Sequence, residues 1–236
     1  MKKLLVLIIT MCVAWTFNSY AALTLNVSRV VYNEKDGDAQ LSVNNDENRT
    51  YLIQSWLDAG DPVNVKKALP FVVTPPLFRL DGNSDNVIRV VYLGTGLPTD
   101  KESLFWLNVK GIPGLNDAEK KFENRMVLAV DNRIKVFFRP ASLNGNASDA
   151  MKNLSWTRNG NRITVENKHP YHVVLNKITA GSEDITISVL DNNSLITPFG
   201  QKTFTLKHAP AQGETIAWTA VNDFGLTSKS FSQRFE

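Results

Sequence analysis

The sequence predicts an all-β protein with two β domains in tandem. Short runs rich in β-branched and aromatic residues alternate apolar with polar side chains, as half-buried strands do. Turn-forming residues separate these runs, and no segment carries a long helical period. Many short strands at regular spacing favour a sandwich or a barrel over an α/β fold.

The N-terminus predicts a secretory signal peptide over residues 1–21. Lys2 and Lys3 precede an apolar run, and a small-residue site ends at Ala21, an order that is typical of export signals. The run is short and interrupted for a membrane span, although an uncleaved anchor remains the alternative. We expect cleavage after Ala21, a mature chain that starts near Ala22, and no membrane insertion afterwards.

Composition and charge indicate a mature chain that is folded, lacks disulfides and does not bind nucleic acid. The single cysteine, Cys12, lies inside the expected signal peptide, so the mature chain has no disulfide. Cleavage removes two of the 26 Lys and Arg residues and none of the 23 Asp and Glu residues, so the formal net charge falls from +3 to +1. A net charge of +1 does not indicate a protein that binds nucleic acid. The hydrophobic fraction of 43% favours a folded domain over disorder.

The first β domain is predicted over residues 22–143. Its strand candidates are residues 23–27, 41–43, 53–56, 87–92 and 104–107. Turn signals separate them at residues 36–38, 59–62, 81–83 and 94–96. Residues 116–126 are interpreted as a polar connection with room for one helical turn.

The second β domain is predicted over residues 148–236. A change in composition follows Arg139 and Pro140, and the small, polar residues 141–150 are typical of a hinge or linker. Strand candidates resume beyond it at residues 162–165, 171–175, 185–189 and 215–218.

Arg29 does not fit a plain sandwich. A single strand would place it on one face with four apolar residues, Leu23, Leu25, Val27 and Val31. A buried guanidinium needs a partner or must face a cleft. The alternative is a bulge that turns Arg29 to solvent, and spacing does not decide between the two.

Residues 125–138 form a strand candidate that is much longer than the usual five or six residues. At a sheet edge, such a strand would expose unpaired backbone groups and could complete the sheet of a partner. The commoner alternative is an ordinary central strand.

Six motifs make the sequence resemble the periplasmic pilus chaperones of chaperone–usher systems, the PapD-like family. The motifs occur in family order along the whole mature chain, and their joint spacing is more specific than any one alone. They are residues 28–32 (SRVVY), 74–80 (TPPLFRL), 102–109 (ESLFWLNV), 133–140 (RIKVFFRP), 167–171 (NKHPY) and 221–225 (VNDFG).

The resemblance implies two immunoglobulin-like β-sandwich domains in a boomerang arrangement with an interdomain cleft. It implies a periplasmic chaperone that binds and folds pilus (fimbrial) subunits by donor-strand complementation, caps their assembly surfaces and delivers them to an outer-membrane usher. Arg29 and Lys135 match the cationic pair that anchors the C-terminal carboxylate of a subunit. Two cations that converge on a carboxylate make charge-assisted hydrogen bonds, which fix the strand register at one point.

The resemblance also assigns the donor residues Met126, Leu128 and Val130, whose apolar side chains would fill the open groove of a subunit. Lys135 has the opposite parity to these three residues. A bulge or local twist must therefore intervene, or one of the two assignments is wrong.

Three further family features match this sequence. Glu102, Arg139 and Asp223 correspond to a trio of interdomain charges that fixes the angle between the domains. The segment Thr74, Pro75 and Pro76 corresponds to a proline loop in which a cis bond is expected. Residues 114–124 are short, as in the subclass with a short F–G loop.

Two rival functions remain open from the residues. An enzyme is disfavoured because the chain lacks the common hydrolase, zinc-protease and nucleotide-binding motifs. His169 and His172 would face opposite sides of a strand, so we interpret them, with His208, as surface or structural residues and expect no metal and no cofactor. A pilus subunit or adhesin is disfavoured because such subunits have one domain and a cysteine pair. A free dimer that covers its own edge stays open.

Overall fold

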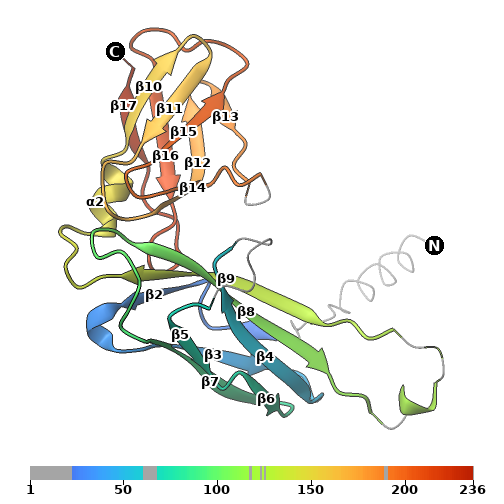
Figure 1. The fold of residues 1–236 in the computed structure, drawn as a ribbon. Helices are drawn as coiled ribbons and strands as arrows, with labels where there is room; N and C mark the ends of the chain where they lie inside the picture. The colour runs from blue at the N-terminus through green and yellow to red at the C-terminus, as the bar shows by residue number, and fades with distance from the viewer. Residues whose placement is uncertain are drawn as a thin grey trace, which may run out of the picture.

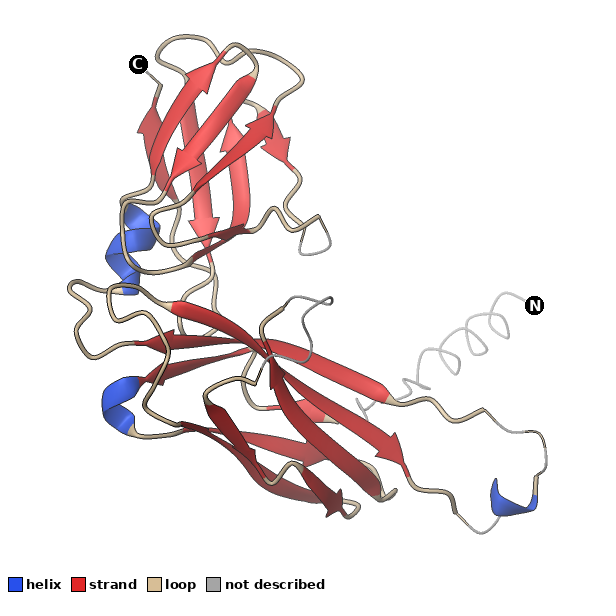
Figure 2. Ribbon diagram, in the orientation of Figure 1, coloured by secondary structure: helices blue, strands red, loops and turns tan. Residues whose placement is uncertain are grey.

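The computed structural model describes residues 23–60, 68–116, 119–122, 124, 126–188 and 191–235. The expected signal peptide lies outside these residues. Two β-sandwich domains meet at an angle, so that the molecule is bent at their junction (Figure 1). Strands account for nearly all regular structure in both domains, as coloured in Figure 2. The all-β prediction is therefore confirmed.

The first domain consists of two facing sheets. One sheet has the strand order β1-β3-β7-β5, with bounds Thr24–Leu25, Ala39–Asn45, Ser84–Tyr92 and Phe71–Thr74. The other has the order β2-β9-β8-β4-β6, with bounds Arg29–Asn33, Val130–Arg139, Ser103–Pro113, Tyr51–Asp58 and Leu77–Leu80. Two short 3-10 turns, η1 (Glu34–Asp36) and η2 (Glu119–Lys121), lie in the connections.

Aromatic side chains fill the core of the first domain at the end near the junction. The ring of Tyr92 lies 4.4 Å from that of Phe138, and Phe71 packs edge-on against Phe105 at 4.9 Å. The hydroxyl of the fully buried Tyr32 donates to the carbonyl of Gly37. Phe138 is therefore fixed by packing, and this fixes the end of β9.

The second domain also pairs two sheets. One has the order β10-β11-β15, with bounds Ser155–Asn159, Arg162–Glu166 and Gln201–Thr205. The other has the order β13-β12-β16-β17, with bounds Glu183–Ile185, Val173–Ala180, Thr215–Ala220 and Phe231–Arg234. The short strand β14 (Leu195–Ile196) also pairs with β12. Trp156 and Trp218 lie in its core with ring centroids 5.6 Å apart.

The predicted linker at residues 141–150 contains the start of a helix that the sequence pattern did not indicate. Helix α2 spans Ala147–Lys152, and the side chain of Asn146 caps it by accepting from the amide of Asp149 at 2.8 Å. Ala150 and Met151 are buried in the core of the second domain. A helix of six residues is too short to show a period, so burial determines it.

The predicted first strand, residues 23–27, is wrong as a continuous element. The chain pairs with β3 at Thr24–Leu25 and then changes sheets to pair with β9 from Arg29 onwards. Val30 and Tyr32 point into the core, so Arg29 lies on the opposite face of β2. Arg29 therefore does not share a face with the apolar residues 23–27, because the chain changes from one sheet to the other between them. No bulge is needed to explain this.

Two other strand predictions are corrected. Of the predicted strand at residues 185–189, Val189 lies outside the described residues and residues 186–188 are not in a strand, because β13 begins earlier and pairs with the end of β12 over only three residues, Glu183–Ile185. Of the long strand predicted over residues 125–138, Arg125 lies outside the described residues, and among the others β9 begins only at Val130. Residues 126–129 have no ladder partner among the described residues, because the pairing with β8 starts at Val130 opposite Gly111.

Candidate functional site

Arg29 and Lys135 are brought side by side at the junction. Strand β2 runs parallel to β9, and Arg29 is the direct register partner of Lys135. The Nη1 of Arg29 donates to the carbonyl of Val221 in the second domain at 3.1 Å. Its guanidinium also lies 5.8 Å above the ring of Phe137. Arg29 therefore contacts both domains.

Neither cation is neutralised by a carboxylate among the described residues. The Nε of Arg29 is buried and has no partner there. Burial lowers the pKa of Arg29, and the charges of Asp223 and Glu102 offset this in part. Burial, and secondly the charge of Arg29, lowers the pKa of Lys135. Two half-buried cations thus lie together with unused capacity to bind an anion.

Trp106 supports this pair, although the sequence did not single it out. It is the register partner of Lys135 on β8, and the Lys135 ammonium lies 4.6 Å from its ring centroid. The guanidinium of Arg133 lies 4.7 Å from the same ring and pairs with Asp58 at 2.7 Å. An aromatic face attracts cations without neutralising them, so Lys135 is held in place and stays available.

The first half of β9 is an open sheet edge within the described part of the chain. Strand β2 pairs with Lys135–Arg139, whereas residues 130–134 pair with β8 on one side only. Met126, Leu128 and Val130 are 84%, 71% and 47% exposed. Apolar side chains and unpaired backbone groups therefore occur together on one segment, which is a template for strand addition.

The bulge expected between the donor residues and Lys135 is not found in β9, where Val130 and Lys135 lie on opposite faces of one regular strand. Its pairing with β8 is regular from residue 130 to 138. Val136 and Phe138 point into the core with the parity of Val130, while Lys135 lies on the opposite face. Met126 and Leu128 precede the strand, so their faces are not set by β9 in the free protein.

The apolar segment before β9 borders a hollow at the far end of the first domain. Met126, Leu128 and Val130 line it, together with Arg49 and Glu119. Arg49 and Glu119 form an ion pair, and Glu119 caps its own turn through mutual hydrogen bonds with Asn116. The connection that leads to the donor segment is thereby tied to the turn before β4.

The predicted charge trio is assembled across the junction. The Nε of Arg139 donates to Glu102 at 2.6 Å, and its two terminal nitrogens bind both oxygens of Asp223 at 2.6 and 2.7 Å. The guanidinium also lies 5.3 Å above the ring of Tyr171. These hydrogen bonds outweigh the effect of burial and raise the pKa of Arg139, so it remains charged. Two parallel hydrogen bonds of this kind restrict the orientation of Arg139 relative to Asp223.

The proline loop and the histidines complete the predicted residues. The Thr74–Pro75 bond is cis, and the carbonyl of Pro75 accepts from the hydroxyl of Ser55 at 2.7 Å. The prediction that His169 and His172 face opposite sides of a strand is wrong, since β12 begins only at Val173. His172 is buried at the junction against Glu102. Its position at the domain boundary could not be seen from its local sequence.

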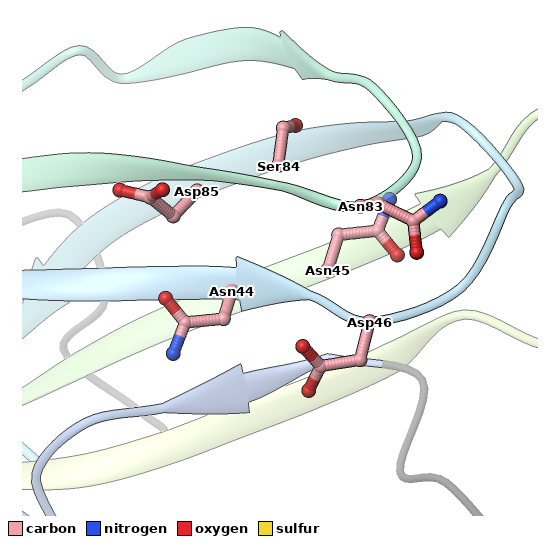
Figure 3. A pocket seen from close by; sticks show the side chains of 6 residues that line it. All are labelled: Asn44, Asn45, Asp46, Asn83, Ser84 and Asp85. Atoms are coloured by element: carbon pink, nitrogen blue, oxygen red, sulfur yellow. The ribbon is translucent and has the colours of Figure 1, made fainter.

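A polar hollow elsewhere on the first domain holds none of the predicted site residues. It lies where β3 and β7 pair at Asn44 and Asn45, and Figure 3 shows its lining side chains. They are three amides, two carboxylates and a hydroxyl, from Asn44, Asn45, Asn83, Asp46, Asp85 and Ser84. Across the described residues, no group of three His, Cys, Asp or Glu side chains is arranged to hold a metal, and no helix is long and apolar enough to cross a membrane.

The fold and the site define a class of protein that binds other chains: two β-sandwich domains that meet at an angle, with an open sheet edge and a pair of cations that no carboxylate of the described residues neutralises. Two family models match the chain: the N-terminal domain of PapD, a pili and flagellar-assembly chaperone, at residues 22–144, and the PapD pili-assembly chaperone C-terminal domain at residues 149–232.

The chain is 40% identical over 212 residues to the chaperone protein FimC of Escherichia coli K12, covering 89% of this chain and 83% of FimC. It resembles the SafB chaperone, solved in complex with the Salmonella enterica SafA pilin, with a TM-score of 0.76, 32% identity and coverage of 92% and 98%. It also resembles the periplasmic chaperone SfaE, with a TM-score of 0.71, 30% identity and coverage of 91% and 100%.

The chain belongs to the PapD family of pilus-assembly chaperones. It is therefore a chaperone of pilus subunits and not an enzyme. The predicted pair of immunoglobulin-like domains is confirmed with it.

Proposed function

We propose that this chaperone captures pilus subunits in the periplasm by adding the edge of β9 and the segment before it to the subunit's incomplete sheet. Arg29 and Lys135 bind the C-terminal carboxylate of the subunit, and an outer-membrane usher then receives the complex. The observation that carries the proposal is the pair of half-buried cations, without a carboxylate partner among the described residues, where the open edge ends at Lys135.

The carboxylate is the natural ligand of this pair because its charge and geometry match. Arg29 still has a buried Nε without a hydrogen-bond partner among the described groups, and the ammonium of Lys135 lies against the ring of Trp106. A carboxylate accepts several hydrogen bonds at once. A single fixed terminus sets which subunit residue meets which residue of β9, and this defines the register.

The apolar half of the interface comes from Met126, Leu128 and Val130. In the free protein only Val130 lies in a strand, so residues 126–129 become extended when a subunit edge supplies their backbone partners. Their exposed side chains enter the subunit's open groove, where burial of apolar area drives association. Without a subunit, the same edge pairs weakly with a second copy, which sedimentation at rising concentration measures.

The anchor is tested by co-expression with a pilus subunit encoded beside the chaperone gene. We expect Arg29→Ala and Lys135→Ala to abolish the soluble one-to-one complex, because each removes a charge-assisted contact worth at least tenfold in affinity, on the order of 1.5–3 kcal/mol.

Arg133→Ala is the matched control for this test. Arg133 lies on the same face of β9 two residues before Lys135, but Asp58 neutralises it. The control should therefore keep the complex, and circular dichroism should show that all three variants are folded. Undiminished complex with both Arg29→Ala and Lys135→Ala would defeat the anchor assignment.

A further inference from the structure

His172 is buried between the two domains and bonds to the charge trio. Its Nδ1 lies 2.9 Å from Oε2 of Glu102, and the two side chains are 6% and 1% exposed. Its ring also lies against Phe137, with centroids 5.6 Å apart. The histidine therefore contacts β9 of the first domain and Glu102, which precedes β8, from its position just before β12.

The contact with Glu102 is part of a reciprocal clamp. The backbone amide of His172 donates to the same Oε2 at 2.8 Å, and the amide of Glu102 donates to the carbonyl of Pro170 at 2.8 Å. The other oxygen, Oε1, accepts from Arg139. Since an ionised carboxylate can only accept, the hydrogen in the side-chain contact is on Nδ1 of His172.

We propose that His172 is a positioning residue for the subunit-binding site and the fourth member of the interdomain network. Its Nδ1–H fixes one oxygen of Glu102, so that the other oxygen meets Arg139, while its ring covers Phe137. Phe137 lies under the guanidinium of Arg29, whose Nη1 binds Val221 across the junction. His172 thereby sets the domain orientation in which Arg29 meets Val221 across the junction.

Two variants separate the hydrogen bond from the packing. His172→Asn keeps an N–H donor at a similar distance from the backbone and loses the ring, whereas His172→Phe keeps a ring against Phe137 and loses the donor. His169→Phe is the matched control, because His169 lies three residues away and no side-chain bond to the trio is found there among the described contacts.

The first measurement is the domain orientation of the free protein, from residual dipolar couplings. We expect His172→Phe to change the relative orientation while each sandwich remains folded, and we expect His172→Asn and His169→Phe to keep the wild-type orientation. Wild-type orientation in His172→Phe, or equal disruption by His172→Asn, would overturn the positioning role.

The second measurement is the affinity for a subunit encoded beside the chaperone gene, and this step alone rests on the proposed function. We expect His172→Phe to bind about tenfold more weakly, because the loss of one hydrogen bond to the buried carboxylate of Glu102 costs about that factor, and His172→Asn to recover most of the affinity. A changed orientation with unchanged affinity would support the positioning role and count against the proposed anchor.

Discussion

The ammonium group of Lys135 occupies a site that disfavours its own charge. Burial, and secondly the neighbouring Arg29, lower its pKa from the ordinary 10.5, although the ring of Trp106 beside the ammonium attracts its charge. A carboxylate bound between the two cations would act in the opposite direction and raise the pKa. Binding and protonation of Lys135 are therefore linked.

The affinity for a subunit's C-terminal peptide should fall as the pH rises through the lowered pKa of free Lys135 towards 10.5. In that window the free chaperone loses the proton while the complex retains it, so binding takes up a proton and weakens with increasing pH. Titration calorimetry at a series of pH values measures this slope. Lys135→Arg should lose the slope, since a guanidinium stays charged; parallel slopes in both proteins would contradict the linkage.

Strand β9 combines two environments in one element. Residues 135–138 lie between β2 and β8, whereas residues 130–134 have one neighbour in the described part of the chain. The apolar segment before it has no regular structure of its own. The anchored half thus holds the register while the open half and its extension adapt to the partner.

Leu128→Glu should weaken subunit capture by at least tenfold, because it places a charge in an apolar groove. Val127→Glu is the paired control, because Val127 is also exposed but takes the opposite face once the segment extends as a strand. The two variants are compared by the yield of complex that co-purifies with each of them. If Val127→Glu proves as damaging as Leu128→Glu, residues 126–130 do not alternate as proposed and the register needs revision.

The sequence predicts where most strands lie along the chain, but it predicts less well which strands pair with each other. Period-two alternation identifies half-buried strands locally, but it does not reveal where a chain changes sheets, so the segment around Arg29 was predicted as one strand. Helix α2 is set by burial of Ala150 and Met151 and has no period to detect. Arg29 and Lys135 were assigned from motifs, whereas Trp106 and His172 become visible only when distant strands and loops pair.

At the scale of the whole molecule, the orientation of the two domains depends on few groups. Arg139 joins Glu102 of the first domain to Asp223 of the second, and His172 reaches Glu102 from the other side. Such buried ion networks are weak contributors to net stability compared with apolar packing, and their clearer effect is to fix geometry. Each sandwich has its own core, so the network couples two units that fold around separate interiors.

Arg139→Met should uncouple the domains without unfolding them. It leaves Glu102 buried without its cation, and breaking such a pair costs about 3 kcal/mol. Calorimetry should then show two separate unfolding transitions where the wild type shows closer coupling, and the anchor should bind a subunit more weakly because Arg29 no longer meets Val221 in one fixed geometry. Arg79→Met is the control, since its pair with Asp81 is exposed on one domain and should contribute little. A single unchanged transition in Arg139→Met would mean that apolar contacts, and not the network, determine how the two domains are joined.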